Sequence, residues 1–167
     1  MKLEQLYDRY GERLFHYLSV KLGSLDDAED VLQEIFLRFA RYTIRWKFIR
    51  KPEAFIFRVA RNEANRFLQN KRNQKLNSQN PGALQDIIQE TIKGPDQGST
   101  EMLARALAKL PDEKREVIVL KVFEGLTFKE IASACGLSIN TVASRYRYGL
   151  AAMKAIMEGK DERNQPR

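Results

Sequence analysis

The sequence has 167 residues, of which 43% are apolar and 10% aromatic, and it can bury the core of one ordinary domain or of two small helical ones. One cysteine and one histidine exclude a disulfide framework and leave too few soft ligands for a structural zinc site. No apolar run approaches the roughly 18 residues of a membrane span, and the amphipathic start, MKLEQLYDRYGERLF, is unlike a signal peptide, so we expect a cytoplasmic protein without membrane insertion.

Positive charge is concentrated in the middle of the chain. The formal net charge is +7, yet residues 1–40 carry 5 basic and 8 acidic side chains, whereas residues 41–76 carry 11 basic and 2 acidic ones. A solvated charged surface is one interpretation of such a block. With so few acids interspersed, we favour a binding site for a polyanion, because neutralised phosphates release counterions.

Two helices are predicted in the first 40 residues. Apolar residues recur at helical spacing from residue 3 to residue 18, and Gly23 marks the end of the first helix. Ser24 and Asp27 have capping-box-like spacing at the start of a second helix, whose apolar stripe runs from residue 28 to residue 39.

A third helix is predicted after the aromatic and basic stretch RYTIRWKFIRK. Pro52 suits the first position of a helix, and apolar residues continue at helical period from residue 55 to residue 68. Polar and basic residues share the opposite face, and no alternating strand pattern occurs anywhere. The fold class is therefore predicted to be all-α.

The amino-acid composition changes between the two helical parts of the sequence. Residues 77–100 are rich in Asn, Gln, Gly and Pro, which predicts a flexible linker. Leu84, Ile87, Ile88 and Ile92 have the spacing of a short amphipathic turn within it. The predicted domains are thus residues 1–76 and residues 101–158, the latter with four helices, followed by a tail at residues 159–167.

The stretch TFKEIASACGLSINTVASRYRYGL predicts two capped helices around a tight turn. Thr127 and Glu130 form a capping box, Gly136 ends the first helix and Ser138 caps the second. We expect Ile139, Val142, Tyr146, Leu150 and Met153 to point into the core and Asn140, Thr141, Ser144, Arg145 and Tyr148 to point outward. Such a pattern is typical of a helix-turn-helix, although a plain helical hairpin with a solvated face is the alternative.

Two motifs in this order resemble those of a known family. LPDEKREVIVLKVFEGLTFKEIASACGLSINTVASRYRYGLAAMK resembles domain four of bacterial sigma factors, and AEDVLQEIFLRFAR followed by PEAFIFRVARNEANRFLQNKR resembles domain two. Because no substantial domain lies between them, the chain is similar to the compact extracytoplasmic-function group of alternative sigma factors. The resemblance covers about residues 3–73 and 101–156.

The resemblance implies partners and site residues. It implies binding of core RNA polymerase, through a coiled coil of the largest subunit, by Asp30, Gln33, Glu34 and Leu37. It implies recognition and melting of the minus-ten promoter element by Arg45, Trp46, Lys47, Arg50, Arg58, Arg61, Asn62 and Asn65, with Tyr42 and Phe48 as further aromatic surfaces for single-stranded bases. It implies recognition of the minus-thirty-five element by Ser138, Asn140, Thr141, Ser144, Arg145, Arg147 and Tyr148.

No nucleophile, acid pair or glycine-rich phosphate loop is visible, so we predict a specificity subunit rather than an enzyme, with no cofactor and no metal. An anti-sigma factor is a further candidate partner. Two alternatives remain at this point: a helix-turn-helix regulator that does not associate with core polymerase, and a nucleic-acid enzyme that uses the acids of DDAED. Copurification with core polymerase separates the first from the sigma factor, and metal-dependent nuclease activity tests the second.

Overall fold

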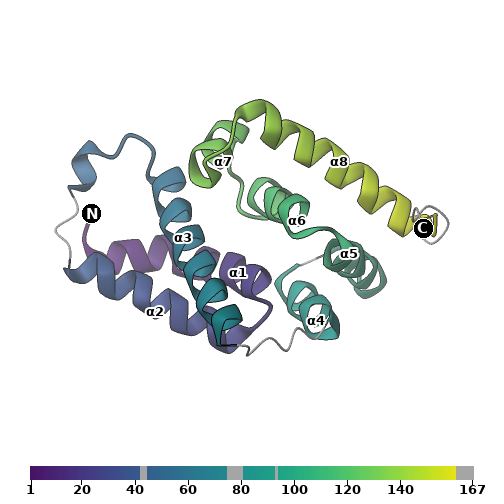
Figure 1. Ribbon diagram of the computed structural model, residues 1–167, viewed down its shortest axis with the longest axis horizontal. Coiled ribbons are helices and arrows are strands. Elements are labelled where there is room, and N and C mark those ends of the chain that lie inside the picture. The colour runs from purple at the N-terminus through teal and green to yellow at the C-terminus, as the bar shows by residue number, and fades with distance from the viewer. Residues whose placement is uncertain (42–44, 75–80, 93, 161–167) are drawn as a thin grey trace.

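The computed structural model describes residues 1–41, 45–74, 81–92 and 94–160, and all regular structure in this part of the chain is helical. Three long helices form the N-terminal part: α1 (Leu3–Leu22), α2 (Leu25–Arg41) and α3 (Pro52–Asn73). They pack on one another around Tyr10, Leu14 and Ile35, which are fully buried. Figure 1 shows this unit beside the group formed by α4 to α8.

The boundaries of these three helices agree with the predicted signals. Gly23 ends α1 in the left-handed conformation, at φ 65°, where a residue without a side chain is favoured. The backbone N–H of Asp27 donates to Ser24 Oγ at 3.2 Å, which anchors the start of α2. Pro52 is the first residue of α3, where its missing N–H costs no hydrogen bond.

A helix lies where the sequence predicted a linker with at most a short turn. This helix, α4 (Pro81–Thr91), packs against α5 (Gln97–Lys109) and α1. Ile87, Ile88 and Ile92 are buried, because their spacing places them on one face. The N-cap of α5 is Asp96, whose carboxylate accepts from the backbone N–H of Ser99 at 2.8 Å, so helical structure resumes earlier than residue 101. Residues 77–80 and 93, like Tyr42 and the tail from 161, lie outside the described residues.

The C-terminal part contains the four predicted helices. After α5 come α6 (Asp112–Ile118), a π-helical turn (Val119–Phe123), α7 (Phe128–Cys135) and α8 (Ile139–Met157). Gly149 is buried where α8 packs against α6, and a Cβ atom there would be 2.8 Å from Ile118 Cδ1. None of the helices in the described ranges is long and apolar enough to cross a membrane.

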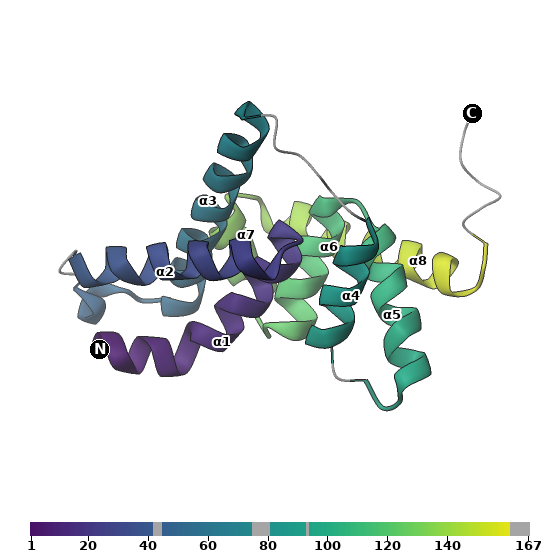
Figure 2. The same ribbon diagram turned by 90° about the horizontal axis from the view of Figure 1, so that it is seen from below.

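The two parts of the chain are in direct contact. Helix α3 lies alongside α7, and α1 contacts α4. Seen from below, the C-terminal end of α3 projects beyond the rest of the molecule (Figure 2). Ion pairs and hydrogen bonds join α1 and α3 to α6 and α7, so the structure is a closed arrangement of the two units.

Candidate nucleic-acid and polymerase interfaces

Helix α2 presents a continuous exposed polar face. Asp30, Gln33, Glu34 and Leu37 are all exposed on it, and Leu37 retains 50% of its accessible surface. The opposite face buries Ala28, which helps to pack the helix on the rest of the unit. Residues three and four apart are neighbours on a helix surface, so these four side chains lie next to one another. The predicted polymerase-binding residues therefore share one accessible surface.

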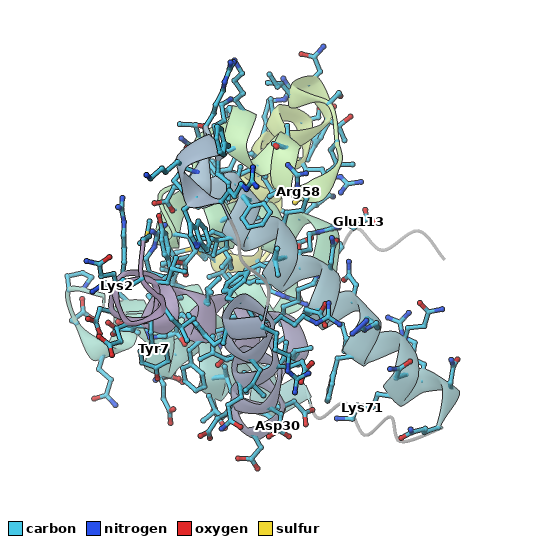
Figure 3. The ribbon with its side chains drawn as sticks, turned by 90° about the vertical axis from the view of Figure 1, so that its left-hand side faces the viewer. Lys2, Tyr7, Asp30, Arg58, Lys71 and Glu113 are labelled. Carbon is cyan, nitrogen blue, oxygen red and sulfur yellow. The ribbon has the colours of Figure 1, made fainter. Side chains whose placement is uncertain are left out.

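Asp30 on this face of α2 and Arg58 on α3 lie on different sides of the unit formed by α1, α2 and α3. Figure 3 shows Asp30 at its lower edge and Arg58 on its upper side. Asp30 and Arg58 are therefore open to different partners.

The described part of the segment between α2 and α3, residues 45–51, holds two aromatic residues in different surroundings. Trp46 is half-buried, and its ring meets Phe39 at 5.7 Å and Phe55 at 5.9 Å in edge-to-face contacts. Phe48 is 76% exposed. The sequence favoured Trp46 over Phe48 as the free stacking surface, and the structure reverses this order, because the Trp46 ring completes the aromatic packing between α2 and α3.

Exposed cations surround Phe48 in this segment. Arg45, Lys47, Arg50 and Lys51 are all exposed. A free aromatic ring among such cations is the combination that binds single-stranded nucleic acid, through stacking on bases and attraction of phosphates.

The four predicted minus-ten residues of α3 divide into two pairs. Asn62 and Asn65 are exposed and project from the helix. Arg58 Nη2 donates to Ser133 Oγ of α7 at 2.9 Å, and Arg61 Nε donates to Glu116 Oε1 of α6 at 3.0 Å. Two of the four residues are thus engaged with the C-terminal part of the chain.

Helices α7 and α8 form the predicted helix-turn-helix. Thr127 and Glu130 make the reciprocal capping box at 2.8 and 3.1 Å, and Gly136 ends α7 with φ 66°. Ser138 Oγ accepts from the backbone N–H of Thr141 at 3.1 Å and lies 2.9 Å from Thr141 Oγ1. These caps fix the first turn of α8, the part that enters a major groove in helix-turn-helix proteins.

The outward face of α8 carries the predicted DNA-reading residues with different degrees of engagement. Asn140 is exposed and Ser144 half-buried. Arg145 Nη2 is 3.9 Å from Glu113 Oε2, and the Arg147 guanidinium lies over the Tyr148 ring, 5.2 Å from its centre. These polar groups can reach base edges or phosphates without disturbing the core.

The inward face of α8 differs from the prediction at two positions. Val142 and Met153 are buried, and Tyr146 packs edge-to-face on Phe128 at 5.3 Å. Ile139 and Leu150 were expected in the core, but they are 48% and 40% exposed. The prediction was wrong there because the buried stripe of α8 runs through Val142, Gly149 and Met153, whereas Ile139 precedes this stripe at the start of the helix and Leu150 lies at its edge.

Two charged clusters join the units, and the sequence analysis identified neither. Glu116 Oε1 accepts from Tyr17, Lys21 and Arg61. Arg13 lies between Glu53 and Glu124, with its Nη1 2.8 Å from Glu53 Oε2 and its Nη2 donating to the Glu124 carbonyl at 2.6 Å. Burial raises the pKa of the Glu124 carboxyl to about 7, although Arg13 opposes that shift. Because the partners are far apart in sequence, no local pattern indicates either cluster.

Family comparisons match both halves of the chain. A family model described as Sigma-70 region 2 matches residues 6–74, and one described as Sigma-70, region 4 matches residues 100–153. The first range coincides with α1 to α3 and the second with α5 to α8.

Similar proteins span nearly the whole chain. RNA polymerase sigma factor SigZ of Bacillus subtilis is 24% identical over 163 residues, which cover 95% of this chain and 89% of that protein. ECF RNA polymerase sigma factor SigL of Mycobacterium tuberculosis is 28% identical over 168 residues, covering 93% and 89%.

Solved structures give the same fold. Sigma factor RpoE from Bartonella quintana, crystallised with the anti-sigma factor NepR, superposes with a TM-score of 0.71 at 18% identity, covering 93% of this chain and 96% of that one. CnrH, solved with the cytosolic domain of CnrY, gives 0.63 at 25% identity, covering 94% and 88%.

A region 2 unit followed by a region 4 unit with a helix-turn-helix defines a sigma-70-type initiation factor. With no large domain between the two, the chain belongs to the extracytoplasmic-function sigma factors, the alternative sigma factors that direct promoter-specific initiation of transcription.

Proposed function

We propose that this chain binds core RNA polymerase through α2, melts the minus-ten element with α3 and the segment before it, and reads the minus-thirty-five element with α8. The observation that carries the proposal is the separation of three chemically distinct surfaces: an acidic and apolar one on α2, a basic and aromatic one around Phe48, and a polar one on α8. The chain supplies specificity, and the polymerase supplies the chemistry.

The α2 surface suits a protein partner. Asp30, Gln33 and Glu34 are exposed carboxylates and an amide next to exposed Leu37, and none of them supports the buried packing of the helix. The coiled coil of the polymerase largest subunit is the partner that the family resemblance indicates. The chain then acts where its polymerase acts, in the cytoplasm.

The minus-ten surface suits melted DNA. Phe48 offers a ring on which an unpaired base can stack, and Arg45, Lys47 and Arg50 lie on the same segment for the backbone. Asn62 and Asn65 on α3 add amide groups that can pair with base edges.

The minus-thirty-five surface suits duplex DNA. Asn140 and Thr141 lie in the first turn of α8, where a recognition helix meets base edges, and Asn can pair with adenine through two hydrogen bonds. Arg145, Arg147 and Tyr148 follow along the helix and can contact bases or phosphates. Ser138 holds the start of the helix in place through its cap.

An anti-sigma factor is a further partner. The support comes from the similar Bartonella quintana structure, in which RpoE is bound to the anti-sigma factor NepR. Copurification of this chain with a protein encoded beside it would test the point directly.

The polymerase contact has a specific test. Replacing Asp30 and Glu34 together by lysine reverses two charges on an exposed face, so the chain should lose binding to core polymerase in a pull-down while keeping its helical circular dichroism. The matched control is the double replacement of Asp8 and Glu12 by lysine, a reversal of equal size on α1, where both residues are exposed. Undiminished pull-down by the α2 variant would contradict the proposal.

A further inference from the structure

A single buried carboxylate joins three helices across the boundary between the two units. Glu116 Oε1 of α6 accepts from Tyr17 Oη at 2.6 Å, from Lys21 Nζ at 3.0 Å and from Arg61 Nε at 3.0 Å. The three donors belong to α1 and α3, whereas Glu116 belongs to the unit that carries the helix-turn-helix. The Glu116 side chain is only 9% exposed, and that of Lys21 is 15% exposed.

The cluster is built to keep this carboxylate ionised inside the interface. Burial alone would raise the pKa of Glu116, but Lys21, the Tyr17 hydroxyl and Arg61 together hold the pKa below its ordinary value. Burial and the neighbouring Glu116 charge raise the pKa of Tyr17 well above its usual range, so Tyr17 remains a hydrogen-bond donor. Each of the three donors therefore has its hydrogen bond satisfied by Glu116 when the units are together, and by water when they are apart.

The same interface occupies residues proposed to contact the minus-ten element. Arg61 donates to Glu116, and Arg58 donates to Ser133 of α7. Helix α3 itself lies along α7 (Figure 1). The Arg61 side chain is only 23% exposed, so a phosphate that binds it would have to replace the Glu116 carboxylate.

We infer that Glu116 is a latch that holds the region 2 and region 4 units closed, and that the closed form withholds Arg61 from DNA. The second half of this inference rests on the proposed function. Opening exchanges three contacts of Glu116 for water and frees the Arg61 guanidinium. A ligand that binds only the open form then shifts the chain toward that form.

The latch is tested without DNA or polymerase. Glu116→Gln keeps the shape of the side chain but leaves Lys21 and Arg61 without a counter-charge in the closed interface, whereas both are hydrated in the open form. Spin labels at Glu29→Cys on α2 and Lys154→Cys on α8, both exposed, report the distance between the units. Native Cys135 is buried beside the same cluster in the closed form, so all labelled proteins carry Cys135→Ala.

The expected result is a broader and longer distance distribution in Glu116→Gln, with the ratio of open to closed molecules raised about tenfold, the effect of losing one hydrogen bond to a charged group. Tyr17→Phe removes a single donor and should shift the same distribution in the same direction by less. The control Glu101→Gln removes an equal charge from an exposed residue of α5 and should leave the distances unchanged. A distribution identical to the parent's in both latch variants would overturn the inference.

A second readout separates the latch from the proposed function. Without core polymerase, Glu116→Gln should bind a single-stranded minus-ten oligonucleotide about tenfold more tightly than Glu101→Gln does, because more molecules are open. Longer distances without tighter DNA binding would confirm the latch and overturn the role of Arg61. Unchanged distances together with intact promoter-specific transcription would overturn the latch and leave the proposed function standing.

Discussion

Trp46 and Phe48 are two residues apart and yet have opposite roles in the structure. Trp46 is held between Phe39 and Phe55, so it fixes the segment that joins α2 to α3. Phe48 projects from that fixed segment with 76% of its surface exposed. An exposed ring on a well-anchored backbone loses little conformational entropy when a base stacks on it.

Alanine at these two positions should therefore have different effects. Phe48→Ala should weaken binding of a single-stranded minus-ten oligonucleotide by about 1–3 kcal/mol through lost base stacking, with an unchanged free energy of unfolding. Trp46→Ala should lower the free energy of unfolding by about 2 kcal/mol, since it removes a half-buried aromatic side chain. Fluorescence titrations and urea denaturation of both variants measure the two effects. Equal DNA binding by Phe48→Ala and the parent would exclude Phe48 as the stacking residue.

Substitutions at different positions of α8 should have different effects on DNA binding. Asn140→Ala should relax preference at one or two base pairs, at a cost of about 1–3 kcal/mol on the preferred sequence and little on others. Arg147→Ala, if it meets phosphate, should weaken all duplexes alike and reduce the salt slope by about one unit. Binding titrations on matched and mutated upstream elements at several salt concentrations distinguish the two. If Asn140→Ala keeps the parent's selectivity, Arg145 and Tyr148 become the next candidates.

At the scale of elements, the turn of the helix-turn-helix depends on the backbone of one residue. Gly136 has φ 66°, and apart from its own atoms and those of its two chain neighbours, none lies within 4 Å of the position that a Cβ would take. The glycine is thus required by its conformation and not by lack of space. The turn fixes how α8 leaves α7, and hence which side chains of α8 face outward.

Alanine at Gly136 should cost about 1 kcal/mol of folding free energy, because a left-handed conformation is unfavourable for a residue with a Cβ atom. Gly98→Ala provides the matched control. Gly98 lies in the first turn of α5, is exposed and has an ordinary helical conformation, so alanine there should raise stability by about 0.5 kcal/mol. Urea denaturation measures the change in the free energy of unfolding for each variant. Stabilisation by Gly136→Ala would contradict this account of the turn.

The elements that the sequence predicted well are those with local signals. The Thr127 capping box, Gly23 and Pro52 mark helix ends through nearest-neighbour chemistry, and the structure confirms each of them. Helix α4 was underestimated because its polar composition resembles a linker. Three isoleucines, residues 87, 88 and 92, become a core face only when α5 and α1 are there to cover them.

At the scale of the whole molecule, the closed arrangement depends on contacts that no local pattern reveals. Glu116 is 99 residues from Tyr17 and 55 residues from Arg61 along the chain. Its inward orientation and its partners follow only from the packing of α6 against the N-terminal unit. The sequence therefore predicted the separate surfaces but not how one unit covers part of another.

The second interunit cluster should make stability depend on pH. The pKa of Glu124 is about 7 in the folded protein because of burial, against 4.5 ordinarily, so the folded state holds a proton that the unfolded state releases between these values. The stabilisation that this bound proton gives the folded state is complete below pH 4.5, and it is lost as the pH rises through 7. The free energy of unfolding should thus fall by about 2 kcal/mol from pH 5 to pH 7 relative to Glu124→Gln, which cannot titrate. Parallel pH dependences in the two proteins would contradict this assignment.

The most direct test of the central claim is reconstituted transcription with core RNA polymerase on the DNA upstream of this chain's own coding sequence and on other fragments of its genome. We predict discrete run-off transcripts that start downstream of paired minus-thirty-five and minus-ten elements, that require the chain, and that are lost with the Asp30 and Glu34 double lysine variant. Transcription that is independent of the chain, or a chain that never associates with core polymerase, would contradict the account.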